Sequence, residues 1–287
     1  MTIHFDRKTF FTYVRRAPFG NRLTQQQVDG ISTILDYYES MPSPPPLEGL
    51  AYTFSTIAWE TGMRMVPVRE TFAKSDEQAY NRLNNAWKNG RIGHVTVSNR
   101  YWRKINGISY FGRGRVQNTH KENYEKLRDR FGHDFVNKPN LLLDNDIDAE
   151  VTVVGHVEGI WTGHDLARYF GEGKEDPVGA RRIINGQDKA RHIASNLYPQ
   201  FLAALEAARE DTPLPTDVSD DEAKPDGKGL LDSTTNLAAA ASGAAGTLGT
   251  LLAALSNPYA LAGLVVIVLA TAWIVRERMR HAREDGV

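Results

Sequence analysis

The 287-residue sequence contains no cysteine, which excludes disulfide bonds, a thiol nucleophile and a zinc–thiolate site. It also lacks an excess of charge, since 34 basic and 35 acidic residues leave a formal net charge of −1. Nucleic-acid binders usually carry a strong basic surplus. We therefore expect no nucleic-acid partner, and the average composition is that of an ordinary soluble protein.

We expect no cleaved signal peptide at the N-terminus. Residues 1–20 contain no continuous apolar stretch after the basic residues, because Asp6, Arg7 and Lys8 interrupt it. A secretory signal requires such a stretch. If the protein works outside the cytoplasm, we expect another route of export.

Charged residues are missing from one long segment near the C-terminus, residues 233–275. Within it, residues 258–275 are apolar almost throughout, with Tyr259 and Trp273 near the ends, and the arginine-rich residues 276–283 follow. A helix needs about 20 apolar residues to cross a bilayer, with aromatic residues at the interfaces and basic residues on the cytoplasmic side. We therefore predict a transmembrane helix at 258–275, with a lipid bilayer as partner and a cytoplasmic C-terminus.

The number of membrane spans stays open. Residues 236–256 are dominated by Ala, Gly and Leu, which suit close helix packing in membranes, and a Ser-Asn-Pro turn follows. One span places the globular domain outside the cytoplasm, whereas a helical hairpin leaves both ends inside.

The chain divides into three predicted regions. Residues 1–208 are the globular domain, residues 209–232 are an acidic, proline-rich linker that we expect to be disordered, and residues 233–287 are the membrane anchor with its basic tail. The alternative for 258–275 is a buried helix of the globular domain. The intervening linker and the absence of a polar face disfavour that alternative.

Helical periodicity dominates the globular region. The pattern predicts helices after a Thr24–Gln27 capping box, along Leu50, Phe54, Ile57 and Ala58, after a Thr119–Glu122 capping box, from Asp146, and from Asp188 to Ala208. Strand-like alternation around Asn106–Gly107 predicts one small hairpin. The fold class is therefore α+β, mainly α.

Two carboxylates, Glu60 and Glu70, flank a glycine and a proline in the segment AWETGMRMVPVRE. On a helical wheel Glu60 borders the apolar stripe, and partial desolvation there would keep it protonated, as a general acid requires. Arg64 and Arg69 would favour the ionised form of Glu70. One protonated and one ionised carboxyl is the arrangement used in glycoside hydrolysis, whereas two solvated surface acids are the alternative.

Other candidate residues fit structural roles better. The Gly-Arg-Gly-Arg run at 112–115 lacks the setting of a nucleotide loop, so we expect backbone packing near a cleft, with Arg113 pairing to a buried acid. The histidines are too scattered for a known metal spacing, and we expect neither a metal nor a cofactor. The rival acids Glu158 and Asp188 are expected at a helix end and at a helix start, where capping explains Asp188.

Four segments together carry a resemblance. FSTIAWETGMRMVPVRE holds both glutamates, and YFGRGRVQNTHKENY, GIWTGHDLARYF and GARRIING follow it. In this order they resemble the phage-encoded, chitinase-like endolysins of glycoside hydrolase family 19. The resemblance implies a lysozyme-like domain with two lobes and a small β-hairpin. It also implies cleavage of β-1,4 bonds at N-acetylated sugars of peptidoglycan by inverting acid–base hydrolysis.

The resemblance implies roles for individual residues. Glu60 would be the general acid and Glu70 the base, separated by roughly 6.5–9.5 Å to admit a water molecule. The expected substrate-binding residues are Gln117, Asn123, Tyr124, Asn185, Trp59 and Arg113. For the two aromatic residues, core packing is the alternative. Trp59 departs from the family, which usually has histidine there, and Asn118 and His120 replace apolar or aromatic residues.

The predicted membrane segment favours peptidoglycan over chitin, because a tethered enzyme reaches only a polymer beside its membrane. We expect an inner-membrane protein whose catalytic domain acts on the wall side. Two alternatives stay open. One is a chitinase that acts on chitin oligomers, and the other is a catalytically impaired, membrane-anchored glycan-binding protein, which Trp59 favours.

Overall fold

Helix α3 (Leu47–Glu60) is buried on every side. In the computed structural model, which describes residues 4–92, 96–184 and 186–209, every residue from Gly49 to Ala58 is buried. The predicted apolar positions Leu50, Phe54 and Ile57 are at most 1% exposed. A helix without a polar face has to be covered all round. The other elements therefore pack around α3.

Helices from both ends of the described chain cover α3 in the main core. They are α1 (Arg7–Arg16), α2 (Gln25–Ser40), α6 (Asn145–Glu158) and α8 (Tyr198–Arg209), the last preceded by α7 (Ala190–His192) and a π-helical turn, Ile193–Leu197. Phe54 of α3 stacks on Phe201 of α8 with 5.5 Å between ring centroids. Thr24 and Gln27 form the predicted capping box at the start of α2, which confirms that prediction.

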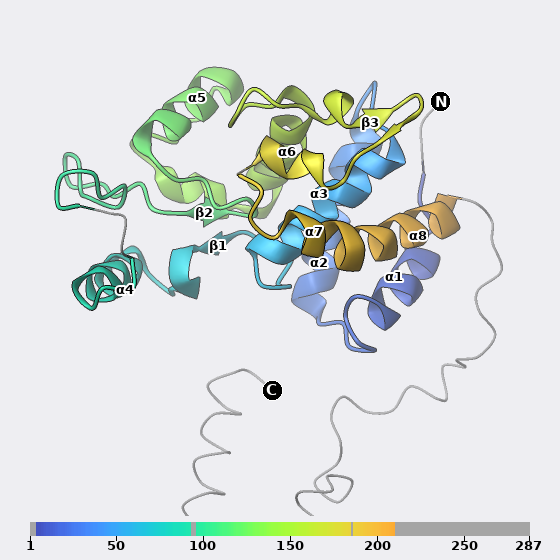
Figure 1. The fold of residues 1–287 in the computed structure, drawn as a ribbon, viewed down its shortest axis with the longest axis horizontal. Coiled ribbons are helices and arrows are strands. Elements are labelled where there is room, and N and C mark those ends of the chain that lie inside the picture. The colour runs from blue at the N-terminus through green and yellow to red at the C-terminus, as the bar shows by residue number, and fades with distance from the viewer. Residues whose placement is uncertain (1–3, 93–95, 185, 210–287) are drawn as a thin grey trace, which may run out of the picture. The chain divides into compact units, whose positions relative to one another are not determined.

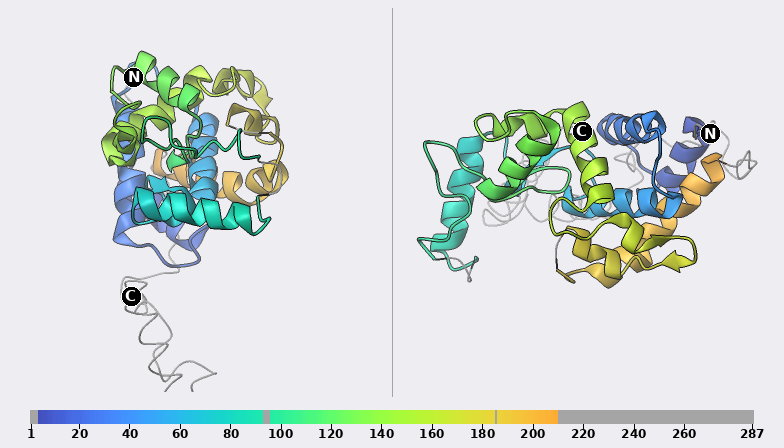
Figure 2. Two further views of the ribbon diagram at one scale, coloured as in Figure 1. Left: turned by 90° about the vertical axis from the view of Figure 1, so that its left-hand side faces the viewer. Right: turned by 90° about the horizontal axis from the view of Figure 1, so that it is seen from above.

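A second part of the fold is built from α4 (Asp76–Lys88) and α5 (Lys121–Phe131). Figures 1 and 2 show these helices at one end of the domain and α1 and α8 at the other. Each helix contributes to its own small apolar cluster: Leu83 packs with Trp102 and Phe111, and Leu127 packs with Phe135. These clusters are separate from the main core around α3.

The strands are short antiparallel pairs. β1 (Val68–Arg69) pairs with β2 (Arg113–Gly114), and β3 (Phe170–Gly171) pairs with β4 (Lys174–Glu175). The short 3-10 helices are η1 (Glu70–Phe72), η2 (Pro139–Leu143), η3 (Leu166–Arg168) and η4 (Gly179–Ile183). The expected mainly helical fold with small antiparallel strands is confirmed. The Asn106–Gly107 turn is present, but its hairpin is a single bridge between Ile105 and Ile108.

Helix starts differ from the predictions at three places. His120, with φ of 67°, precedes α5, so the Thr119–Glu122 capping box is wrong. Lys189, with φ of 57°, precedes α7 in the same way, and the side chain of Asp188 is 75% exposed. In both cases a left-handed residue turns the chain and takes the capping position. At α6 the cap is Asp144, two residues before the predicted start, whereas the helix ends at Glu158 as expected.

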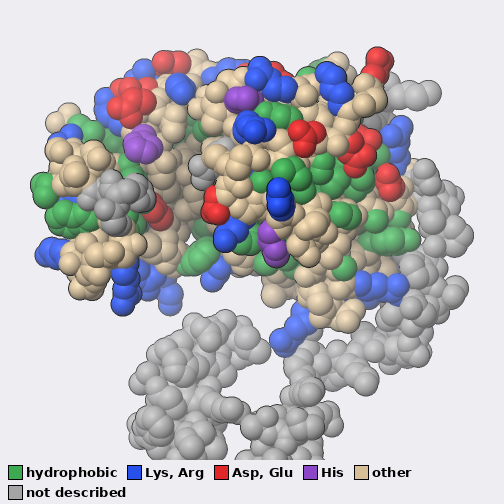
Figure 3. Space-filling model, in the orientation of Figure 1, with side chains coloured by type: hydrophobic (Ala, Val, Ile, Leu, Met, Phe, Trp, Pro, Cys, Tyr) green, Lys and Arg blue, Asp and Glu red, His purple; other side chains and the backbone are tan. Residues whose placement is uncertain are grey.

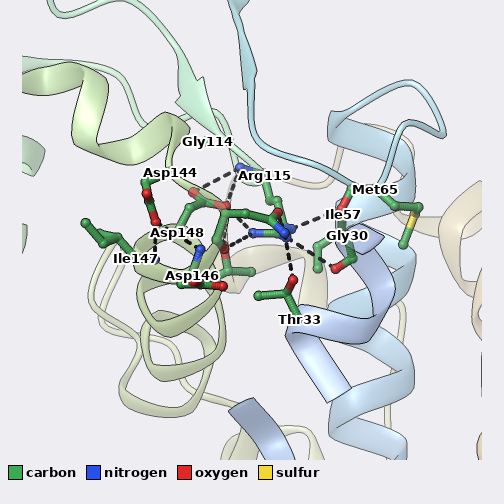
Figure 4. Close-up of polar contacts among 12 residues, drawn as sticks. Gly30, Thr33, Ile57, Met65, Gly114, Arg115, Asp144, Asp146, Ile147 and Asp148 are labelled. Carbon is green, nitrogen blue, oxygen red and sulfur yellow. Dashed lines mark hydrogen bonds and ion pairs between the residues drawn. The ribbon is translucent and has the colours of Figure 1, made fainter. Parts of the chain in front are cut away.

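Arg115 is fully buried and joins β2 to three other segments (Figure 4). Its guanidinium forms a 2.9 Å ion pair with Asp148 of α6 and donates to the carbonyl oxygens of Met65 at 3.0 Å and Gly30 at 3.2 Å. Burial raises the pKa of Asp148 and lowers that of Arg115, while their mutual attraction opposes both shifts. The side chain therefore ties α2, α6 and the loop after α3 to β2.

Among the residues that the structure describes, no helix is both long enough and apolar enough to span a membrane. The predicted membrane segments, 236–256 and 258–275, lie outside these residues. The same holds for nearly all of the predicted linker.

The buried Arg115–Asp148 pair leads to a stability prediction. Asp148→Asn leaves the guanidinium buried without its counter-charge, so we expect the free energy of unfolding to fall by about 3–5 kcal/mol. Denaturant unfolding measures this change. Glu158→Gln is the matched control, because it breaks an ion pair with Arg130 whose side chains are 48% and 39% exposed. The control should lose less than about 1 kcal/mol, and equal losses in the two variants would contradict the role of Arg115.

Candidate active site

Glu60 reaches solvent because α3 ends there. Its side chain is 18% exposed, and its Oε1 lies 2.7 Å from Nη2 of Arg181, a nearly buried residue of η4. A carboxylate at a helix C-terminus faces the negative end of the helix dipole, so the arginine offsets an unfavourable position. The prediction that Glu60 borders an apolar stripe of α3 is wrong. Every residue from Gly49 to Ala58 is buried, so the helix has no exposed face from which a stripe could be distinguished.

Glu70 follows β1 and is held by its backbone and its side chain. Its N–H donates to the carbonyl oxygen of Gly112 at 2.7 Å, and the Gly112 N–H donates to Glu70 Oε2 at 2.7 Å. The hydroxyl of Tyr101 donates to Oε1 at 2.5 Å. A Cβ at position 112 would lie 2.6 Å from Gln117 Oε1 and 3.3 Å from Glu70 Oε2, so a side chain there would displace the Gln117 amide.

The pKa of Glu70 is raised, chiefly because burial disfavours the charged form. The donors from Tyr101 and Gly112 and the charges of Arg113 and His120 oppose the rise. Between the ordinary and the raised pKa the folded protein binds more protons here than the unfolded chain, so this group's contribution to stability falls as pH rises. An ionised carboxyl with a raised pKa is also a stronger base.

The predicted partners of Glu70 are wrong. The guanidinium carbon of Arg64 lies 3.9 Å from the ring centroid of Phe72, and Arg69 Nε donates to Asp76 Oδ1 at 2.7 Å. Both arginines are close to Glu70 in sequence, but their side chains engage other groups. Arg113 and His120, which follow more than 40 residues later, supply the charges instead.

The loop that joins the two glutamates and the turn directly after Glu70 are strained. Met63, Met65, Thr71 and Phe72 all have positive φ, between 52° and 67°. Each such non-glycine residue costs on the order of 1 kcal/mol, and strain of this kind persists mainly at functional sites. Figure 3 shows the molecular face hollowed between the part that carries α4 and α5 and the part that carries α7.

Two predicted substrate contacts are wrong. Arg113 is fully buried, and its guanidinium donates to Asp76, Asn140 and Ser109 as well as to the hydroxyl of Tyr124. Tyr124 is also fully buried, and its hydroxyl donates to the Phe111 carbonyl. Neither side chain has a surface left for a sugar. Arg113 does pair with an acid, as expected, although the Asp76 side chain is 41% exposed.

The amide of Gln117 lies beside Glu70. Its Nε2 donates to the carbonyl oxygens of Val68 and Gly114 at 3.0 Å each, which turns its Oε1 toward Gly112. The side chain is partly buried, so a role in substrate binding stays a prediction.

Asn123 and Trp59 are partly exposed, and their roles also stay predictions. Asn123 donates to the Thr119 carbonyl at 2.8 Å. Trp59 packs beside His192 of α7, with 5.3 Å between ring centroids. Asn185 lies outside the described residues.

Sequence reasoning missed Tyr101 and Arg181, the side chains that contact the two glutamates. Arg181 falls within the GARRIING segment, so that segment held a signal for it. Tyr101 had no such signal, because it is separated from Glu70 by 31 residues.

A separate cavity of about 640 Å³ is lined by α4, residues 104–109 and residues 137–140, and contains neither glutamate. Glu60 and Glu70 stay the predicted site.

Comparison with known proteins finds similarity to a family model over part of the chain. Residues 71–162 match the family model of glycoside hydrolase 19, described as chitinase class I. The crystal structure of a chitinase C mutant is similar with a TM-score of 0.42 and 16% sequence identity, over 75% of this chain and 96% of that chain. No curated protein sequence matches the chain. The similarity to that family is thus limited to residues 71–162, and both Glu60 and Glu70 lie outside the matched range.

The hydrogen bond from Tyr101 leads to a prediction about Glu70. Tyr101→Phe removes a donor that favours the ionised carboxyl, so we expect the pKa of Glu70 to rise further. NMR titration of ¹³C-labelled glutamate carboxyls measures it, with the signal assigned from Glu70→Gln. Tyr13→Phe, at a partly buried tyrosine of the main core, should leave the pKa of Glu70 unchanged. An unchanged or lower pKa in Tyr101→Phe would show that the bond does not hold the ionised form.

Proposed function

We propose that the protein is a glycoside hydrolase that cleaves β-1,4 bonds at N-acetylated sugars of peptidoglycan. The observation that carries the proposal is that Glu60 and Glu70 lie at the two ends of one strained loop and have different partners. An arginine contacts Glu60, and a backbone N–H donates to Glu70. Glu60 forms an ion pair with Arg181, whereas Glu70 is half-buried, accepts from the neutral donors of Tyr101 and Gly112, and has a raised pKa. The family match at residues 71–162 supports glycoside hydrolysis.

In the proposed reaction Glu60 gives its proton to the glycosidic oxygen as the bond from that oxygen to the anomeric carbon breaks. Glu70 takes a proton from a water molecule, whose oxygen attacks the anomeric carbon from the opposite face. The products are a free hydroxyl on the leaving sugar and an inverted hemiacetal. Arg181 then faces the Glu60 carboxylate that proton donation creates, and stabilises it.

Tyr101 and Gly112 fix the base in this scheme. Burial and the neighbouring Glu70 raise the pKa of Tyr101, so its hydroxyl keeps its proton and donates to Oε1. The Gly112 N–H donates a hydrogen bond to the other carboxyl oxygen of Glu70, Oε2. Each oxygen of an ionised carboxyl accepts more than one hydrogen bond, so Glu70 can still accept a proton from water.

The predicted membrane helix at 258–275 extends the proposal to the cell. A catalytic domain tethered to the inner membrane on its wall side acts on the polymer beside that membrane, which is the role of an endolysin. The apolar segment and the acidic linker before it support this location. The second candidate is a chitinase that acts on chitin oligomers, which the chitinase class I description of the matched family favours.

Digestion of purified peptidoglycan, followed by mass analysis of the released reducing ends, tests the proposal. We expect soluble fragments with new sugar reducing ends. We also expect Glu60→Gln and Glu70→Gln each to lower kcat by about 10²- to 10⁴-fold, the usual contribution of a general acid or base. Glu122→Gln, at an exposed acid of α5, is the matched control and should retain activity.

Two results would contradict the proposal. Release from chitin but not from peptidoglycan would favour the chitinase. Binding to peptidoglycan without any released fragment would favour a glycan-binding protein.

A further inference from the structure

Phe72 is an exposed aromatic residue two positions after Glu70. Its exposure is 46%, and the other exposed large hydrophobic residues within the described ranges are Val97 and Val178. A single exposed hydrophobic side chain is common and needs no explanation. What distinguishes Phe72 is its backbone conformation and the neighbours of its ring.

The backbone at this position is unfavourable for a side chain. Thr71 has φ of 60° and Phe72 has φ of 52°, so two successive non-glycine residues are left-handed, the first of them β-branched. Arg82 Nη1 donates to the Thr71 carbonyl at 2.8 Å and holds the turn. The turn reverses the chain directly after Glu70 and directs the Phe72 ring back toward the end of α3.

The ring contacts the segment that follows the other glutamate. A Cβ at Gly62 would lie 3.1 Å from Cζ of Phe72, so the glycine leaves the space that the ring approaches. The guanidinium of Arg64 lies over the ring, with Cζ 3.9 Å from the centroid. The ring of Phe72 therefore lies beside Gly62, two positions after Glu60.

We propose that Phe72 and Arg64 form a sugar-binding platform. It positions a pyranose ring beside the glycosidic bond that Glu60 and Glu70 cleave. The electron-rich face of an aromatic ring attracts the weakly positive C–H groups of a sugar. The guanidinium holds the ring by a cation–π contact, and its N–H groups suit hydroxyl and acetamido oxygens. The ligand class is a polysaccharide of N-acetylated sugars, and the position at the cleaved bond rests on the proposed function.

Binding without turnover tests the platform. In full-length protein that carries Glu60→Gln, we measure depletion from solution by insoluble peptidoglycan and, separately, by chitin. Adding Phe72→Ala should weaken binding to the preferred polymer by about five- to tenfold, the range expected for one aromatic contact. Phe72→Tyr keeps the ring and should bind within about twofold of the parent. Val97→Ala, at an exposed hydrophobic residue outside the site, should bind like the parent.

In active protein, Phe72→Ala should raise KM by a similar factor while kcat stays within about twofold. The hydrogen bonds that hold the Glu70 carboxyl come from Tyr101 and Gly112, and the substitution leaves both donors in place. Unchanged binding of Phe72→Ala to both polymers overturns the platform, as does an equal loss in Phe72→Tyr. If the wild type releases no fragments, the proposed reaction fails, and the binding series still decides whether Phe72 contacts the polysaccharide.

Discussion

The position of the candidate site depends on one buried guanidinium. Arg115 links β2 to α6 through Asp148, to α2 through the Gly30 carbonyl, and to the loop after α3 through the Met65 carbonyl. A buried ion pair adds little net stability compared with apolar packing, because removing both charges from water is costly. Its effect here is positional: Met65 lies midway along the loop between Glu60 and Glu70. The same side chain therefore fixes both the loop and strand β2, and β2 directly follows Gly112, which bonds to Glu70.

The two glutamates show how one loop creates two chemical environments. Glu60 ends a helix that is otherwise enclosed, and its closest charged neighbour is Arg181. Glu70 begins a short 3-10 helix under cover of Tyr101, and burial raises its pKa. The left-handed, strained residues lie between the glutamates and directly after Glu70, while the aromatic and aliphatic core around α3 stabilises the domain. Stability in one part thus permits unfavourable backbone conformations in the other.

Much of the helical framework was predictable, because its signals are local. The capping box of α2 and the apolar positions of α3 are patterns within single segments. The complete burial of α3 was not predictable, since Thr53 and Ser55 look polar in the sequence. Their hydroxyls donate to carbonyl oxygens four residues earlier and so tolerate burial.

The site was predictable only in part. Both glutamates stood out from their segment, but the partners that hold them come from distant segments that no local pattern joins. Arg113 and Tyr124 belong to a recognisable motif, and only the folded chain shows that they bond to each other in the interior. Left-handed residues such as Thr71 and His120 give no sign in the sequence, because their conformation is imposed by the surrounding fold.

The proposed hydrolysis requires Glu60 and Glu70 to face one sugar from opposite sides. A crystal structure of the Glu60→Gln protein with a soluble oligosaccharide of N-acetylglucosamine tests it most directly. The account predicts a glycosidic oxygen within hydrogen-bond distance of the side chain at position 60, with Glu70 on the other side of the adjoining anomeric carbon. A sugar bound in the separate cavity beside α4, with neither side chain in contact, would contradict it.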